Sequence, residues 1–339
     1  MVPTIKDVAR AAGVSTASVS RVLTNHPATS PEMRERVLAA ARELNFRPNA
    51  VARSLRSTGT RTVGLVVSDL LNPYFTELAR AVEDTARAAG YSVIVGNADE
   101  DPAQQDHYIR ILLERQVDGL IVVPTVDTSP LLREAAELNH NLVLVDRPAD
   151  DVDAPTVLAD ASSAIAELVD HLVAGGRTDP AIIAGPEHVG TARVRLEHFR
   201  AALAEHGIAL RPERVLHGDF RAASGHDAMA ALLAAEPRPD AVFVTNGSMA
   251  LGVLQLLAEQ HAADPLLVPD DIALAVFDDM PWFTLLRPTV TAIAQPTAEL
   301  GERAMRLLLA RINGTDLPDG DALRCRLTVR DSTLPRRSA

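Results

Sequence analysis

The sequence has little of several residue types that define common protein classes. Of its 339 residues only Cys325 is a cysteine, and aromatic residues make up 3%. A single cysteine excludes an intrachain disulfide, and without a second cysteine or a histidine nearby it does not form a metal site. No run approaches 18 consecutive apolar residues, and Lys6, Asp7 and Arg10 interrupt any apolar stretch near the N-terminus. These absences predict a cytoplasmic protein that does not enter a membrane.

Motifs of common enzymes are also missing. The first expected strand is followed by Ser68-Asp69-Leu70-Leu71-Asn72-Pro73 and not by a G-x-G-x-x-G phosphate loop. No G-x-x-x-x-G-K-[ST], G-x-S-x-G or H-E-x-x-H occurs. The ten histidines are scattered without the spacing of metal ligands. We therefore expect a protein that is not an enzyme and holds no cofactor and no metal.

Charge is divided unevenly along the chain. The formal net charge is −12, yet residues 1–60 carry 9 basic against 4 acidic side chains, while the other 279 residues carry 24 against 41. A uniformly acidic protein would be repelled by nucleic acid, whereas a basic head on an acidic body directs the head toward it. This asymmetry makes the N-terminal segment the expected DNA contact.

The first 23 residues have the pattern of two short helices joined by a tight turn. Thr4 can cap the first helix, Gly13 allows the turn, and Ser15 can cap the second helix. Such a helix-turn-helix turns the outer face of its second helix toward a DNA major groove. That face carries hydroxyls, a methyl group and a guanidinium, which suit phosphates and base edges: Thr16, Ala17, Ser18, Ser20 and Arg21. The plainer alternative is a small helical hairpin without a ligand.

A third helix is expected to close the core of this head. Ser30 can cap it, Pro31 suits its first position, and Met33 and Val37 begin an apolar spacing that continues to Leu44. Asn45 is expected to end it in the left-handed conformation. Residues 49–56 follow Pro48 and would form a helix too short to be stable alone in water, so they should order only against DNA or a second copy.

These segments, together with Ser30–Val37 and Leu44–Leu55, resemble the DNA-binding head of the lactose-repressor (LacI) family of bacterial transcription regulators, and the resemblance covers nearly the whole chain. It implies that residues 47–60 form a hinge and linker whose short helix pairs across a dimer. Leu55 then matches the leucine that the family inserts into the minor groove; the alternative is a linker residue packed loosely on the body. The expected DNA-binding residues are Thr4, Ser15, Thr16, Ala17, Ser20, Arg21, Asn49, Ala52, Arg53 and Leu55.

From residue 63 the chain alternates short apolar runs with amphipathic segments. The runs predict strands at 63–68, 91–96, 119–123 and 141–146, then at 181–184, 214–217, 241–245, 272–277 and 289–293. The segments predict helices at 74–89, 102–115, 129–139, 162–174, 191–206, 224–235, 248–260 and 297–312. This is the pattern of parallel sheets covered on both faces. Two doubly wound units in tandem create a cleft at the carboxyl ends of their strands.

The expected fold is thus α/β, with an N-terminal three-helix head at 1–46 and a two-lobed, doubly wound body of the periplasmic-binding-protein type. The first lobe is assigned to 61–161 and the second to 162–289. The resemblance implies that the chain crosses between lobes again, so that about 290–320 return to the first lobe and about 321–334 to the second. Residues 335–339 are expected to be a disordered tail, and without leucine heptads a homodimer is favoured over a tetramer.

Polar side chains follow several of the expected strands, where a buried strand does not need them. Ser68, Asp146 with Arg147, Asn246 and Asp278 occupy such positions. Charged and amide groups there can bind hydroxyls, and aromatic rings can stack on sugars or purines. Taken singly, each could instead be a cap or a surface ion pair. The resemblance assigns effector contacts to Arg195, Phe220, Asn246 and Asp278 in the second lobe and to Tyr74, Phe75 and Asp146 in the first; Ser68, Asn72 and Arg147 complete the expected site.

Two departures from the family pattern leave the effector open. The family often has Asn-Asp where this chain has Asn246-Gly247, and a glycine where Val276 precedes Phe277-Asp278. The prediction is a transcriptional repressor that binds palindromic operator DNA as a homodimer under control of a sugar or sugar derivative. The alternatives are a purine-type effector, a solute-binding protein of a transport system, which the head and the missing export signal disfavour, and a metabolic enzyme, which lacks a nucleophile or cofactor motif.

Overall fold

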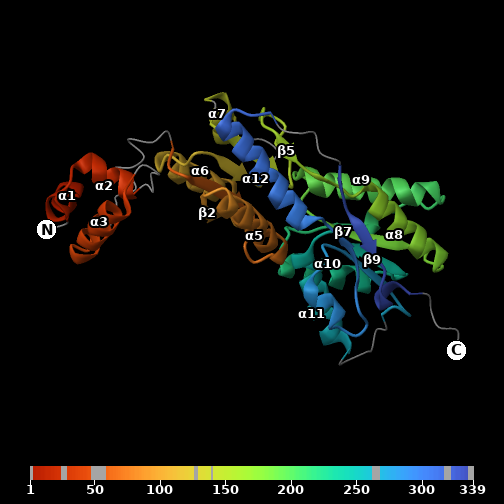
Figure 1. Cartoon of the computed structure of the whole chain (residues 1–339). Helices are drawn as coiled ribbons and strands as arrows, with labels where there is room; N and C mark the ends of the chain where they lie inside the picture. Colours follow the sequence, from red (N-terminus) through yellow and green to blue (C-terminus); the bar gives the residue numbers. More distant parts are fainter. Residues whose placement is uncertain are drawn as a thin grey trace. The chain divides into compact units, whose positions relative to one another are not determined.

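The computed structural model describes residues 3–23, 29–46, 59–125, 129–138, 140–261, 268–316 and 322–334. They divide into two compact units, residues 1–60 and 61–339, which are considered separately (Figure 1). The expected hinge residues Asn49, Ala52, Arg53 and Leu55, and the expected tail at 335–339, lie outside the described residues.

The head contains the three expected helices, α1 (Ile5–Ala12), α2 (Thr16–Leu23) and α3 (Pro31–Glu43). The Ser15 hydroxyl accepts a hydrogen bond from the Ser18 amide (3.1 Å), and the Ser30 hydroxyl accepts one from the Met33 amide (3.2 Å). Gly13 (φ 64°) and Asn45 (φ 49°) are both left-handed, as expected for residues that end a helix. Buried side chains from all three helices pack together: Val8, Ala9, Ala12, Val19, Val22, Val37, Ala40 and Ala41.

The first lobe of the body is a parallel five-stranded sheet in the order β2-β1-β3-β4-β5. Its elements along the chain are β1 (Thr62–Val67), α5 (Pro73–Ala88), β2 (Ser92–Asn97), α6 (Pro102–Glu114), β3 (Leu120–Val122), α7 (Pro130–Glu137), β4 (Leu142–Val145) and β5 (Thr156–Val157). Helices α6 and α7 pack on one face of the sheet and α5 on the other. Because both faces are covered, β1, β3 and β4 are buried along nearly their whole length.

The second lobe is built on a six-stranded sheet in the order β13-β11-β10-β9-β7-β8. Its elements are α8 (Ser162–Ala174), β7 (Pro180–Ala184), α9 (Gly190–Glu205), η1 (Pro212–Arg214), β8 (Val215–His217), α10 (Ala222–Ala234), β9 (Ala241–Val244), α11 (Gly247–His261), β10 (Ala273–Phe277), η2 (Pro281–Thr284), β11 (Thr291–Ala294), β13 (Arg326–Thr328) and η3 (Asp331–Thr333). Helices α8 and α9 cover one face, and α10 and α11 cover the other (Figure 1).

The chain returns to the first lobe later than the sequence predicted. We expected the strand at 289–293 in the first lobe, but β11 pairs with β10 in the second, with Ala275 opposite Thr291. Residues 278–290 are long enough for the crossover that a parallel neighbour requires, so the strand extends the sheet that it has just left. Helix α12 (Thr297–Asn313) does pack beside α5 in the first lobe (Figure 1). A two-stranded sheet of β6 (Ala159–Asp160) and β12 (Leu323–Arg324) joins two of the passages between lobes.

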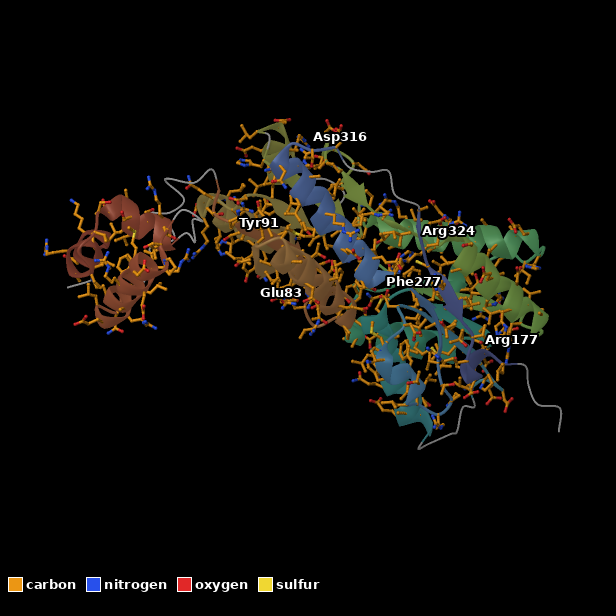
Figure 2. All side chains as sticks on the ribbon, viewed as in Figure 1. Glu83, Tyr91, Arg177, Phe277, Asp316 and Arg324 are labelled. Atoms are coloured by element: carbon orange, nitrogen blue, oxygen red, sulfur yellow. The ribbon has the colours of Figure 1, made fainter. Side chains whose placement is uncertain are left out.

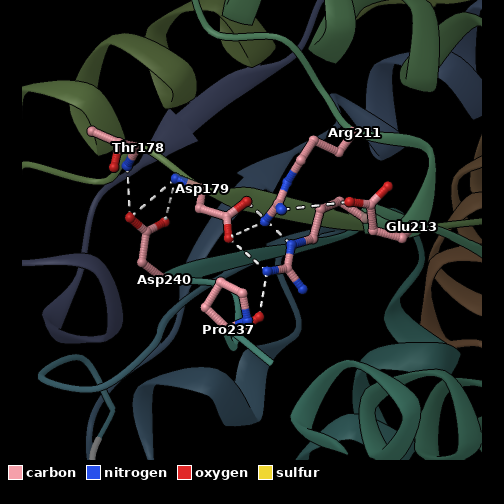
Figure 3. A network of polar contacts seen from close by, with 7 residues as sticks. Thr178, Asp179, Arg211, Glu213, Pro237 and Asp240 are labelled. Atoms are coloured by element: carbon pink, nitrogen blue, oxygen red, sulfur yellow. Dashed lines mark hydrogen bonds and ion pairs between the residues drawn. The ribbon is translucent and has the colours of Figure 1, made fainter. Parts of the chain in front are cut away.

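An ionic network centred on the buried Arg214 ties the second lobe together at the amino ends of its strands (Figure 3). The Asp179 carboxylate accepts hydrogen bonds from Arg214 (2.6 Å and 3.1 Å) and from Arg211, and Arg214 also donates to the Pro237 carbonyl. Asp240 accepts from the amides of Thr178 (2.6 Å) and Asp179 (3.1 Å). The Arg214 side chain is only 2% exposed, so this network fixes the edge of the sheet opposite the expected ligand site.

Candidate functional site

The head presents an exposed polar surface on α2. Val19 and Val22 are buried against the other helices, whereas Thr16, Ala17 and Arg21 are exposed and Ser20 is half-buried. These exposed positions share the face predicted to read DNA. At the start of α1, the Thr4 hydroxyl donates to the Asp7 carboxylate (2.6 Å), and this contact lowers the pKa of Asp7.

In the body, nine of the ten expected effector residues line one cavity between the two lobes. They come from the ends of strands and from the helices that follow: Asn72, Tyr74, Phe75, Asp146, Arg147, Arg195, Phe220, Asn246 and Asp278. The cavity volume is about 10 Å³, enough for about one water molecule. The lobes are therefore closed on each other. A ligand the size of a sugar can enter only if the two lobes move apart, or if they close around it after it has bound.

Ser68 is the exception among the expected residues. It follows β1 directly, yet its side chain is completely buried and does not reach this cavity. Side chains alternate along an extended segment, so the residue after a strand can face the core as easily as the cleft. The Ser68 carbonyl accepts a hydrogen bond from the Glu100 amide (2.8 Å), which gives this residue a structural contact in the loop after β2.

Three of the cavity residues have a backbone conformation that side chains rarely adopt. Asp146, Phe220 and Asp278 have φ values of 69°, 66° and 76°. Each costs on the order of 1–3 kcal/mol and persists only where the surrounding structure demands it. Each follows the end of a strand, so the strain turns these three side chains into the same cavity. Strain that gathers in one place is typical of ligand sites.

The second-lobe wall pairs a cation with a carboxylate. The Arg195 guanidinium donates to the Thr245 carbonyl (2.9 Å) and lies 3.7 Å from the centroid of the Phe277 ring. The Asp278 carboxylate accepts a hydrogen bond from Gln295 (2.8 Å). Burial raises the pKa of Asp278, and the nearby Arg195 and the Gln295 hydrogen bond oppose this rise without cancelling it. A guanidinium and a carboxylate beside each other can each bind a pair of adjacent hydroxyls.

The first-lobe wall is held by buried polar pairs. The Tyr74 hydroxyl donates to Asp146 (2.8 Å), and burial together with this carboxylate raises the pKa of Tyr74 well above its usual value. Burial alone would lower the pKa of Arg147, but its two hydrogen bonds to Glu100 (2.7 Å and 2.8 Å) outweigh that effect and raise it. The Arg147 guanidinium also lies 5.0 Å from the centroid of Phe220, across the cleft. The first-lobe wall therefore contacts the second lobe through the Arg147 cation, which lies against the Phe220 ring.

A second contact between the lobes lies beside the first. Arg221, at the start of α10, donates to the carbonyl of Asp99 (2.9 Å), and its guanidinium also lies 3.4 Å from the Asp99 carboxylate. Asp99 and Glu100 follow β2 in the first lobe, and Phe220 and Arg221 follow β8 in the second. Phe220 and Arg221 thus both link to the first lobe, Phe220 through Arg147, which Glu100 holds, and Arg221 through Asp99. We call the Asp99–Arg221 pair the rim pair.

The other sites that the sequence left open can be checked on the described residues. Within the ranges given above, no group of three or more histidine, cysteine, aspartate or glutamate side chains is arranged to hold a metal ion. In the same ranges, no helix has both the length and the apolar character to cross a membrane.

Comparison with known proteins identifies the two units. Residues 4–49 match the model of bacterial regulatory proteins of the lacI family, and residues 60–327 match the model of periplasmic binding proteins and the sugar binding domain of the LacI family. The chain belongs to the lacI family.

Relatives of this lacI-family chain extend over almost its whole length. It is 36% identical to the ribose operon repressor of Escherichia coli (strain K12) over 91% of this chain and 93% of that protein. It is 35% identical to catabolite control protein A of Priestia megaterium, over 91% and 92%. The structure of the lac repressor dimer bound to operator and an anti-inducer matches with a TM-score of 0.83 at 29% identity, covering 98% of this chain and all of that one.

Two residues that line the cavity between the lobes were not predicted from the sequence. Thr191 and Gln295 also line it. Gln295 directly follows β11, so the rule that found Asp146 and Asp278 applied to it as well, but the expected strand was given the wrong end and the wrong lobe. Thr191 lies four residues before Arg195 in α9 and shares its helix face.

The departure at Gly247 has a packing explanation. A side-chain carbon at this position would lie 2.1 Å from Cε of Met280. Met280 is buried in the second-lobe core, so it occupies the space that the aspartate common in the lacI family would need. The Gly247 amide instead hydrogen-bonds the Asp278 carboxylate. The cavity keeps a polar contact at this point, supplied by the backbone.

Proposed function

We propose that this chain is a dimeric transcriptional repressor of the cytoplasm whose affinity for a palindromic operator is set by a sugar or sugar derivative bound between the lobes. The observation that carries the proposal is the cavity in which Arg195 and Asp278 face Tyr74 and Asp146 across the two lobes. A ligand held by both walls binds one arrangement of the lobes better than the other, and it can shift an equilibrium only through that difference.

The coupling to DNA runs through the segment between the head and the first lobe. Residues 47–60 precede β1, the first strand of the body, so a change in the first lobe alters the anchor of the hinge. If the hinge orders only on DNA and beside a second copy, its free energy of ordering is part of operator affinity. A lobe arrangement that moves the anchor points of the two hinges apart, one hinge in each subunit, therefore releases the operator.

Exposed apolar side chains on the body support a dimer. Leu71 is 85% exposed just before α5, and Ile94 and Val95 are exposed on the edge strand β2. The second lobe also has exposed apolar side chains, Leu285, which is 78% exposed, and Leu251. Exposed apolar residues and an unpaired strand edge are typical of surfaces that a partner covers. A second copy would also supply the second recognition helix that a palindromic site requires.

The test begins with a binding selection on random DNA using the full-length chain, followed by titration of the selected site. We expect a two-fold symmetric site, and we expect Arg21→Ala to weaken binding by about 1–3 kcal/mol, or roughly 5–150-fold. Arg36→Ala on α3 is the matched control, because it removes the same charge from an exposed position outside α2.

The two variants and the selection decide between outcomes. A smaller loss for Arg36→Ala supports direct readout by α2, whereas equal losses would reduce the role of Arg21 to general charge. A selected site without two-fold symmetry would contradict the dimer. Thermal-shift screening of sugars and nucleobases then identifies the effector, since a ligand at 100 times its Kd stabilises by about 2.7 kcal/mol. Stabilisation by nucleobases alone would replace the sugar with a purine-type effector.

A further inference from the structure

A second pocket lies where the chain passes between the two lobes. Its volume is about 620 Å³, within the range of small-molecule sites, and we call it the crossover pocket. Its walls come from the start of α8, from the passage between β11 and α12, and from β12 with the residues that follow it. Because α8 belongs to the second lobe and α12 to the first, both lobes build the crossover pocket. It has room for a ligand in the same lobe arrangement that leaves the effector cavity almost filled.

Four charged side chains line the crossover pocket. Glu167 comes from α8 and Glu299 from the first turn of α12. Arg324, labelled in Figure 2, and Arg326 come from β12 and β13. Alternate residues of an extended segment face the same side, so the two guanidiniums lie together while Cys325 between them packs in the second-lobe core. All four charged residues are exposed, and none forms an ion pair with another residue that the structure describes.

The charges of the crossover pocket balance, with two of each sign. A simple anion would be attracted by the arginines but repelled by the glutamates, and a simple cation would meet the reverse. A molecule that carries one carboxylate and one ammonium group suits both pairs, because guanidiniums bind carboxylates and carboxylates bind ammonium groups through charged hydrogen bonds. Amino acids and short peptides have this distribution of charge.

Gln295 connects the crossover pocket to the effector cavity. It lines both spaces, and its side-chain amide donates to the Asp278 carboxylate (2.8 Å). A ligand that touches both α8 and α12 binds one arrangement of the lobes better than another. By linkage, its binding changes the affinity of every other ligand that depends on the same arrangement.

We infer that the crossover pocket is a second regulatory site, which binds an amino acid or short peptide with its carboxylate at Arg324 and Arg326 and its ammonium group at Glu167 and Glu299. This site goes beyond the proposed function, although its effect on operator affinity rests on that function. The effector cavity and the crossover pocket share only Gln295 among their lining residues, so both can be occupied at once.

Binding is tested on the full-length chain with probes of defined charge. A thermal-shift screen of the twenty standard amino acids and the dipeptide glycylleucine is followed by isothermal titration calorimetry. Each amino acid that binds is compared with two analogues that lack one of its charges, which for leucine are 3-methylbutan-1-amine and 4-methylpentanoate. We expect both analogues to bind at least about tenfold more weakly, since each loses a hydrogen bond between charged groups.

Substitutions in the crossover pocket locate the binding site. Arg326→Gln and Glu299→Gln should each weaken amino-acid binding about tenfold or more. Arg311→Gln and Glu137→Gln are the matched controls, because they remove the same charges from exposed positions outside the pocket. In an operator titration, the bound amino acid should change the operator Kd by about fivefold or more, and Arg326→Gln should abolish that change.

The outcomes separate this inference from the proposed sugar effector. If no probe bound, if the single-charge analogues bound as tightly as the amino acid, or if binding survived both pocket substitutions, the crossover site would be overturned and the sugar site would stand. Binding that is lost in Arg195→Ala but kept in Arg326→Gln and Glu299→Gln would place the amino acid in the effector cavity and refute both proposals. Binding without any change in operator affinity would overturn the regulatory role.

Discussion

Replacing Arg195 should separate effector sensing from operator binding. Arg195 is 8% exposed, and its guanidinium donates to the Thr245 carbonyl and lies near Asp278 on the second-lobe wall of the cavity. Removing one partner of a buried charged hydrogen bond costs roughly 2–5 kcal/mol of binding, so Arg195→Ala should raise the effector Kd by about 30-fold to several thousandfold. The head is a separate unit, so operator affinity without effector should be unchanged.

Folding has to be checked in the same variant. Arg195→Ala leaves the Thr245 carbonyl without this donor, which costs about 1–3 kcal/mol of stability, and it removes the contact with Phe277. Thermal unfolding without ligand measures that cost, and Arg195→Lys keeps a charge but not the fork that binds two oxygens. Arg193→Ala is the matched control, because Arg193 is exposed on the same helix.

The assay pairs calorimetry with an operator titration in the presence and absence of effector. A folded Arg195→Ala body that binds effector normally would refute the assignment and leave Arg195 a structural residue of the second lobe. If the effector is lost, the phenotype gives the sign of regulation. Permanent repression identifies an inducer, and permanent expression identifies a corepressor.

Three further outcomes are expected. Leu55→Ala should weaken operator binding in a gel-shift titration while effector affinity stays constant, since an apolar wedge compensates for unstacking a base step, and equal operator affinity would place Leu55 outside the minor groove. Arg221→Ala should lower effector affinity only about two- to fivefold by calorimetry, because an exposed ion pair such as the rim pair contributes about 0.2–1 kcal/mol; a larger loss would show that Arg221 contacts the effector. Asp179→Asn should lower the free energy of unfolding of the body by about 2–3 kcal/mol at neutral pH. Burial alone would raise the pKa of Asp179, but Arg214 and Arg211 outweigh that effect and lower it. The stability that the ionised carboxylate contributes is therefore present above its unfolded-state pKa near 3.9 and is lost as the pH falls through its lower folded-state pKa. Urea titrations from pH 7 to pH 3 should therefore show parent and variant converging in acid, and a constant difference would contradict the ionic role.

Local rules explain which parts of the structure the sequence predicted well. The helix starts at Ser15 and Ser30 and the left-handed stop at Asn45 depend on neighbours within a few residues, and all three are found. Placing Asp146 and Asp278 beside one cavity needed one more assumption, that carboxyl ends of parallel strands meet at a common edge. That assumption also applies to Gln295, which was missed because the end of its strand was set too early.

What failed depends on partners distant in sequence. The apolar run at 289–293 reads the same whether it joins the first sheet or the second, and only the pairing of β11 with β10 decides. Ser68 fails for a related reason, because the twist and pleat at the end of β1 decide which way its side chain points. The small volume of the closed cavity and the larger crossover pocket follow from packing between elements, which no local pattern records.

The late arrival of α12 constrains how a cell can make this protein. Leu300, Ala304, Met305 and Leu308 complete the apolar core beneath α5, although the strands of that sheet are encoded in the first half of the chain. During translation the first lobe must therefore wait, partly uncovered, until most of the polypeptide has left the ribosome. The head has no such dependence and can fold while synthesis continues. A product truncated before α12 would carry an intact DNA-reading head on a body that cannot finish folding.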